Sequence, residues 1–254
     1  MPSEVHLLTI LPHISPDYST FSITALAPNE FGALVSVAED GLARLWSREG
    51  QLQSALNHPS PIFAVEWNPS GTLFLTLSRC LASVWDSWGE CVRSYVGTEL
   101  SNWGWRGEWE LVIAGQEGVA TWDLNQGEVK VILQEPVDNL AVSGSLIAAV
   151  QKGCVKVISK ESLWSFSSEC SCLSWHLHTL VVGTPSGNLS LWNVETREEV
   201  KEFEAHKGTV TKLKERGDGE LFVSVGEDSV INVWSWSKFS KVRSLSTKYP
   251  LADM

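Results

Sequence analysis

The chain has 254 residues, of which 43% are hydrophobic and 19% charged, so its composition is that of a protein with a buried core. It carries 30 acidic against 19 basic residues, a formal net charge of −11. This balance argues against nucleic acid and against an anionic membrane surface as partners, because both attract basic side chains.

The start of the chain is not typical of a secretory signal. Residues 1–6, MPSEVH, contain no basic region, and no long apolar run follows them. No segment reaches the ~20 apolar residues of a membrane-spanning helix. The five cysteines, an odd and low number, indicate reduced thiols. We therefore expect an intracellular protein that is not secreted and has no membrane span.

A tryptophan recurs through the chain at a nearly constant spacing. It ends the runs GLARLW, LASVW, GVATW, GNLSLW and SVINVW, and Ile158 ends a degenerate copy, GCVKVI. The six positions are 39, 37, 36, 34 and 42 residues apart. Each run alternates in period two and is preceded by a turn signal and another apolar run, which predicts β-strands rather than helices.

These repeats predict six units of about four strands each. Their expected ranges are 21–57, 62–96, 100–133, 138–166, 170–204 and 209–246. One such unit cannot bury both its faces, whereas stacking the units around an axis does so. We therefore predict an all-β fold, a single propeller of six four-stranded antiparallel blades. A β-sandwich is the alternative.

A further strand at 5–10 (VHLLTI) is expected to pair with the last blade and so close the ring. Residues 241–247 compete for the same edge.

The lines VWDSWGE and ATWDLNQGE resemble the WD repeat, and the sixth unit resembles a complete copy of it. In that family a buried chain of hydrogen bonds runs from an indole N–H through a hydroxyl and an imidazole to a carboxylate. The resemblance implies that a structural tetrad of this kind is formed by His206, Ser224, Asp228 and Trp234. It implies partial tetrads of Ser36, Asp40 and Trp46 in the first blade, and of His58, Thr76 and Trp85 in the second.

Residues 40–95 are similar to two consecutive blades of the transducin-beta-like co-repressor subunits of histone deacetylase complexes. The similarity is carried by DGLARLWSREGQLQSAL, HPSPIFAVEWNPSGTLFLTL and VWDSWGECVRSYV. It implies a nuclear scaffold. The family has a self-association segment before an eight-bladed propeller, whereas this sequence begins almost at once with VHLLTI and has room for six blades.

One stretch offers possible metal ligands. CSCLSWHLH brings together Cys170, Cys172, His176 and His178, and alternate strand positions share a face. The spacing matches no usual zinc pattern, so we interpret these residues as core packing, with zinc as the alternative. The His–Ser–Asp set of the sixth blade is interpreted as structural. We expect no catalytic, metal or cofactor site.

The resemblance to WD repeats implies that the turns between second and third strands surround the mouth of the central channel, and candidate partner-binding residues lie there. The glutamates are Glu39, Glu117 and Glu227, with Phe63 and Trp103 at the start of neighbouring first strands. An acidic rim around aromatic side chains suits a basic, extended peptide; a merely solvated face is the alternative.

Two further segments leave alternatives open. The segment SNWGWRGEWE places Trp103 and Trp105 on one strand face, with Trp109 beyond them. These side chains either fill the space between blades or anchor a partner. The basic C-terminal run of Lys238, Lys241, Arg243 and Lys248 is interpreted as a solvated last strand, with a phosphate or peptide contact as the alternative.

The sequence therefore predicts a non-catalytic scaffold in a nuclear co-repressor complex. Its expected partners are co-repressor or deacetylase subunits and basic peptides, with no direct nucleic acid and no membrane, and it acts as a monomer or as a subunit of a hetero-complex. The alternative is a general propeller adaptor in a coat or nuclear pore, a ubiquitin ligase or ribosome assembly, with a cytoplasmic location.

Overall fold

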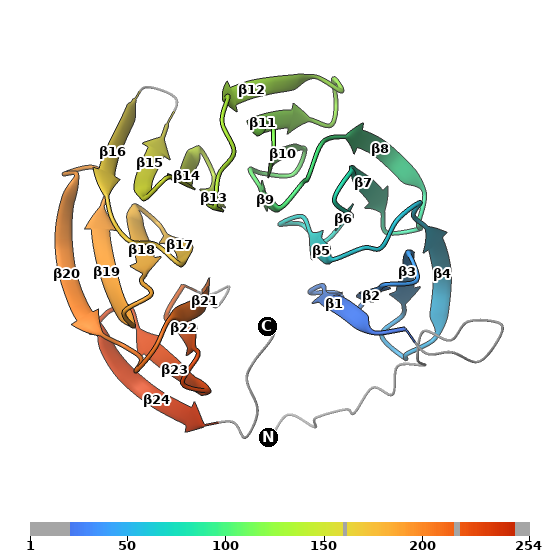
Figure 1. Cartoon of the computed structure of the whole chain (residues 1–254). Helices are drawn as coiled ribbons and strands as arrows, with labels where there is room; N and C mark the ends of the chain where they lie inside the picture. The colour runs from blue at the N-terminus through green and yellow to red at the C-terminus, as the bar shows by residue number, and fades with distance from the viewer. Residues whose placement is uncertain (1–20, 160–161, 216–218, 247–254) are drawn as a thin grey trace.

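A computed structural model describes residues 21–159, 162–215 and 219–246. Within these ranges the chain forms 24 strands and no helix, and so no helix that could span a membrane. The strands make six antiparallel four-stranded sheets, each following chain order. Figure 1 shows these sheets as blades side by side around a common axis. The prediction of an all-β, six-bladed propeller is confirmed.

The first three blades contain the strands β1 (Ile23–Pro28), β2 (Leu34–Ala38), β3 (Leu42–Trp46) and β4 (Leu52–Asn57), then β5 (Ala64–Trp67), β6 (Leu73–Leu77), β7 (Leu81–Asp86) and β8 (Cys91–Val96), then β9 (Asn102–Trp105), β10 (Glu110–Gly115), β11 (Gly118–Asp123) and β12 (Val129–Leu133). The last three contain β13 (Asn139–Ser143), β14 (Leu146–Gln151), β15 (Cys154–Ile158) and β16 (Leu163–Ser167), then β17 (Cys172–His176), β18 (Thr179–Gly183), β19 (Asn188–Asn193) and β20 (Glu198–Glu204), then β21 (Val210–Glu215), β22 (Leu221–Gly226), β23 (Val230–Ser235) and β24 (Ser240–Ser246).

The four strands of each blade lie within a few residues of the range expected from the tryptophan spacing. The expected ring-closing strand at 5–10 lies outside the described residues.

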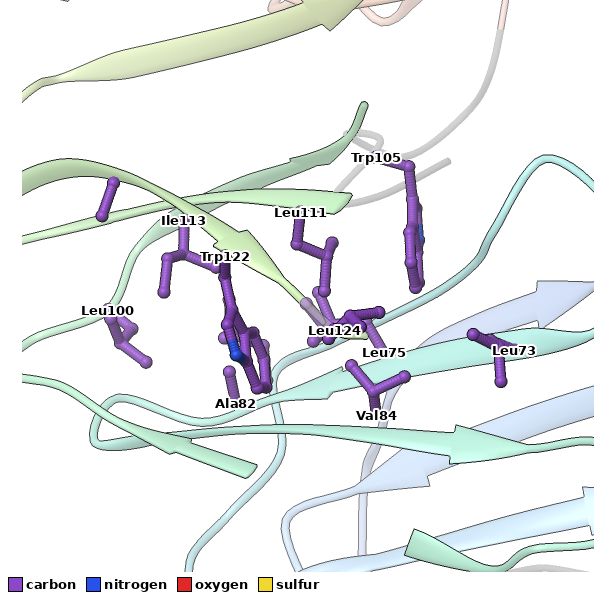
Figure 2. Close-up of a cluster of buried hydrophobic side chains, with 13 residues drawn as sticks. Leu73, Leu75, Ala82, Val84, Leu100, Trp105, Leu111, Ile113, Trp122 and Leu124 are labelled. Carbon is purple, nitrogen blue, oxygen red and sulfur yellow. The ribbon is translucent and has the colours of Figure 1, made fainter. Parts of the chain in front are cut away.

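The core lies between the blades rather than within them. Five buried apolar clusters are found in the described residues, and each joins two successive blades. Figure 2 shows the cluster between blades two and three, where Trp105, Leu111, Ile113 and Trp122 face Leu73, Leu75, Ala82 and Val84. The middle strands are apolar on both faces because each blade packs on two neighbours.

Blade six departs from this pattern on the face turned away from blade five. Val223 and Val233 occupy the places that Val35 and Leu45 hold in blade one, as judged from the strand pairing around Ser224 and Ser36. Val35 and Leu45 are at most 1% exposed, whereas Val223 and Val233 are only partly buried. In the described part of the chain, no sixth apolar cluster joins blade six to blade one.

In blade three, Gly118 at the start of β11 lies very close to the backbone of Leu133 at the end of β12. Gly118 has φ 113°, and a Cβ atom there would lie 2.0 Å from the carbonyl oxygen of Leu133. We expect Gly118→Ala to lower the free energy of unfolding by about 1–3 kcal/mol, because the left-handed backbone and the clash both resist alanine. Urea unfolding measures the loss.

Gly107→Ala is the matched control. Gly107 has φ 123°, close to that of Gly118, and a Cβ atom there would meet nothing within 4 Å. Equal losses for the two variants would show that the approach of Leu133 contributes nothing.

Candidate protein-interaction faces

Blade six contains a buried chain of four hydrogen-bonded side chains. The Trp234 Nε1–H donates to Ser224 Oγ at 2.9 Å, and Ser224 Oγ lies 2.7 Å from His206 Nε2. His206 Nδ1 lies 3.0 Å from Asp228 Oδ1, which requires the Nδ1–H tautomer. Since His206, Ser224 and Trp234 are each at most 4% exposed, every link satisfies a polar group that water does not reach.

Asp228 ends this chain at the turn between β22 and β23. Burial alone raises the pKa of this carboxyl, but hydrogen bonds from the Lys207 backbone N–H, from His206 and from the Val230 backbone N–H lower the pKa below its ordinary value. The carboxylate therefore stays ionised and fastens the loop before β21 to the turn after β22.

The lowered pKa of Asp228 makes stability depend on pH. Below the ordinary aspartate pKa the unfolded chain takes up a proton that folded Asp228 refuses. We therefore expect the contribution of Asp228 to be complete above that value and to be lost as the pH falls through the folded-state pKa. Urea unfolding between about pH 3 and pH 6 should show a shallower fall for Asp228→Asn than for the wild type. Parallel curves would contradict the assigned bonds.

Blade one repeats the indole–hydroxyl link of blade six. The Trp46 Nε1–H donates to Ser36 Oγ at 2.9 Å. Asp40 forms an ion pair with Arg44 at 2.9 Å and accepts a bond from the Leu42 backbone N–H.

In blade two the three residues that we grouped from the sequence are not all joined. Trp85 Nε1–H donates to Thr76 Oγ1 at 2.8 Å. His58 Nδ1 lies 3.3 Å from the Ser60 carbonyl oxygen, and within the described residues its buried Nε2 has no partner. Burial lowers the pKa of His58 against a smaller opposing effect of the Ser60 carbonyl. The short turn without aspartate leaves this histidine unlinked to Thr76.

Blade five holds an indole–hydroxyl pair that the sequence reasoning missed. Trp192 Nε1–H donates to Ser190 Oγ at 3.1 Å, two positions earlier on β19. A hydroxyl on the same strand face as the tryptophan was the available signal.

The cysteines and histidines of CSCLSWHLH point to different neighbours. Cys172 Sγ lies 3.4 Å from the Val210 carbonyl oxygen, and burial raises the pKa of both Cys170 and Cys172 to about 12. His176 Nδ1 lies 2.5 Å from Glu215 Oε1, whereas His178 Nδ1 lies 3.6 Å from Glu195 Oε1. Over the ranges that the structure describes, no three metal-ligating side chains converge.

The glutamates of the predicted acidic rim are exposed to solvent, whereas the two aromatic residues predicted with them are partly buried. Glu39, Glu117 and Glu227 are exposed, each in the turn between the second and third strands of its own blade. Phe63 and Trp103 meet edge to face, with ring centroids 6.2 Å apart, and are partly buried.

A polar contact continues from this aromatic pair. The Trp103 Nε1–H donates to Glu66 Oε2 at 2.7 Å, and Lys214 Nζ of blade six lies 4.0 Å from Glu66 Oε1. The innermost strands β5, β9 and β21 are thereby linked near the axis. A ligand at this mouth would meet separate glutamates around one fixed aromatic–acidic cluster.

Comparison with known proteins places this architecture. Residues 197–235 match the family described as WD domain, G-beta repeat. The chain also superposes on the C-terminal WD40 domain of Sif2 with a TM-score of 0.74 and 19% identity, over 91% of this chain and 73% of that one. The fold is that of a WD40 propeller. The computationally designed Ika8 protein is similar too, with a TM-score of 0.73 and 21% identity over 89% of this chain and 74% of that one.

Curated relatives match this WD40 propeller over parts of their length. Apoptotic protease-activating factor 1 of Mus musculus is 24% identical over 92% of this chain and 17% of its own. Autophagy-related protein 16 of Arabidopsis thaliana is 26% identical over 66% of this chain and 37% of its own. The chain therefore spans between about a sixth and somewhat over a third of these two proteins.

The tryptophan-rich segment of the WD40 propeller divides between core and surface. Trp105 is 9% exposed and packs with blade two, and Trp103 packs against the same cluster. Trp109, in the turn after β9, is 45% exposed. Two of the three indoles thus fill space between blades, and the third is left to solvent.

The basic run lies on the outermost strand of blade six. Lys241 and Arg243 belong to β24 and are exposed, and Lys238 is exposed in the preceding turn. Lys241 Nζ lies over the Trp234 ring, 5.6 Å from its centroid, and so makes a cation–π contact with the tryptophan of the tetrad. Lys248 lies outside the described residues.

Proposed function

We propose that this protein is a non-catalytic scaffold that binds other proteins. WD-repeat proteins generally act in this way. The proposal is supported above all by the blade-six tetrad, whose His206, Ser224 and Asp228 resemble a hydrolase set but hold a buried tryptophan. Both ends of the propeller present turns on a rigid support, where binding residues are commonly found.

We further propose that the scaffold serves a nuclear transcriptional co-repressor complex with a histone deacetylase as associate. Support comes from the resemblance of residues 40–95, which extend from the turn before β3 almost to the end of β8. The exposed rim glutamates add support, because a histone-tail-like peptide is basic and extended.

A general adaptor role in another assembly is the second candidate. The relatives favour it, because one is named for protease activation in apoptosis and another for autophagy, and each matches over only part of its length. A cytoplasmic location belongs with this candidate.

Affinity purification of the tagged chain, followed by mass spectrometry, distinguishes the co-repressor role from the adaptor role. Deacetylase subunits recovered from a nuclear fraction would support the co-repressor role. The tethered chain should then lower reporter transcription in a deacetylase-dependent way. A cytoplasmic chain that recovers no such subunits and leaves the reporter unchanged would support the adaptor role.

Charge reversal at the rim tests the binding face. We expect Glu39→Lys combined with Glu227→Lys to weaken binding of a histone-tail-like peptide by about tenfold at low salt, because attraction becomes repulsion. Fluorescence anisotropy measures the affinity, and an unchanged melting temperature shows that the chain stays folded. Glu49→Lys, in the turn between β3 and β4 at the other end of blade one, is the control. Unchanged affinity in the double variant would place the peptide elsewhere.

A further inference from the structure

Three aromatic side chains of the first three blades are left in solvent. Phe31 is 69% exposed, Trp88 81% and Trp109 45%, whereas every other tryptophan and phenylalanine in the described ranges is buried or partly buried. Phe31 lies in the turn between β1 and β2, Trp88 between β7 and β8, and Trp109 between β9 and β10. Of these three, only Trp109 was expected from the sequence as a possible partner contact.

All three lie at the same end of the propeller. In an antiparallel four-stranded blade, the turn after the first strand and the turn after the third strand share one end. The rim glutamates occupy the turns after the second strands, at the opposite end. We call the end formed by the turns that carry Phe31, Trp88 and Trp109 the aromatic platform.

Bonds between blades hold the platform together. The Asn29 side-chain N–H donates to the Gly71 carbonyl oxygen at 3.3 Å, and the Phe31 ring lies close enough to touch a Cβ atom placed on Gly71. The Asn68 side-chain N–H donates to the Glu108 carbonyl oxygen at 3.3 Å, directly before Trp109. The Ser54 hydroxyl of blade one donates to the Trp88 carbonyl oxygen at 3.3 Å.

The first two contacts connect the turns of Phe31 and Trp109 through the turn between β5 and β6, and the third attaches the Trp88 turn to β4. A partner would therefore meet side chains whose supporting backbone is already ordered, which reduces the entropy lost on binding.

The charge around the platform is mostly negative. Five exposed glutamates lie in the turns at this end of the first three blades, at Glu30, Glu49, Glu90, Glu108 and Glu128. The basic side chains in the same turns are Arg48 and Arg106, and Arg106 forms an ion pair with Glu110 at 3.1 Å.

We propose that the aromatic platform docks a peptide segment of a partner protein that carries bulky apolar side chains flanked by lysine or arginine. Tryptophan is enriched among residues that dominate binding energy, and the exposed rings provide apolar contact area. The surrounding glutamates attract the basic flanks and disfavour acidic segments. The proposal rests on the scaffold function but uses the end opposite the acidic rim.

A random dodecapeptide library displayed on phage and selected on the whole chain tests the proposal. We expect the enriched peptides to combine large apolar residues with lysine or arginine. Their synthetic copies should bind about tenfold more weakly to Phe31→Ser, Trp88→Ser and Trp109→Ser variants, because the truncated side chains remove apolar contact area. Fluorescence anisotropy at fixed salt measures each affinity.

Val96→Ser is the matched control. Val96 is 77% exposed but ends β8 at the opposite end, so this variant should bind the peptides like the wild type. Since all four replaced side chains are exposed, the melting temperatures of the four variants should stay close to that of the wild type. Failure to enrich any peptide, enrichment of acidic ones, or equal affinity for all variants would overturn the proposal. The Glu39→Lys, Glu227→Lys variant should lose affinity for the histone-tail-like peptide and still bind the platform peptides. This result would show that the two ends of the propeller bind different ligands.

Discussion

The Trp122→Ala variant is expected to lose about 3–5 kcal/mol of the free energy of unfolding. Trp122 is 2% exposed and lies in the cluster between blades two and three (Figure 2). Its ring centroid lies 5.8 Å from that of Tyr95. Alanine would leave a cavity between two sheets whose spacing is fixed by neighbours on both sides, so the space would not collapse. Urea unfolding followed by circular dichroism measures the loss.

Trp88→Ala is the control for this experiment. The same side chain is removed from the same pair of blades, but Trp88 is 81% exposed, so we expect a change of at most about 0.5 kcal/mol. A loss for Trp122→Ala no larger than that for Trp88→Ala would contradict packing between blades as the main source of stability.

Ser224→Ala is expected to lower the free energy of unfolding by about 3 kcal/mol, because two buried groups lose their partner. The Trp234 N–H loses its acceptor, and His206 Nε2 loses the hydroxyl that lies 2.7 Å away. Alanine is nearly as small as serine, so packing changes little and the loss reports the hydrogen bonds. The melting temperature should fall with it.

Thr76→Val in blade two is the comparison for Ser224→Ala. Thr76 Oγ1 accepts the Trp85 N–H and donates a long bond of 3.4 Å to the Ser83 carbonyl oxygen, but His58 is not bonded to it. Valine therefore leaves the indole N–H unpaired and removes one weak bond, without affecting a histidine. We expect roughly half the effect of Ser224→Ala. A wild-type melting temperature for Ser224→Ala would show that the tetrad does not stabilise blade six.

Most of the fold could be predicted because the pattern is repeated. Strand alternation and the recurring Trp46, Trp85 and Trp122 determine where third strands lie, and apolar runs before them locate the second strands. Blade four follows from the same spacing although Ile158 replaces the tryptophan, because Val155 and Val157 still pack in the core. The family match of residues 197–235 covers the unit in which the tetrad is complete.

The candidate faces were harder to predict, because they depend on turns. Periodicity assigns a side chain to one face of a strand but gives no direction for Phe31 or Trp88, which lie between strands. The position of His58 likewise depends on a turn one residue shorter than that of blade six. For the segment of Trp103, Trp105 and Trp109, alternation grouped the first two correctly, but only the packing of blade two shows that Trp109 remains outside.

The face of blade six that is turned away from blade five is partly exposed, and this affects where unfolding begins. In the described chain, five apolar clusters connect six blades in series, so blades two to five each have two packed neighbours and blades one and six have one. Such an array behaves like a row of coupled units in which opening begins at an end. Blade six, one of those ends, contains the complete tetrad of His206, Ser224, Asp228 and Trp234. Its internal bonds offset the missing neighbour, so amide exchange in β22 and β23 should become faster in the Ser224→Ala variant.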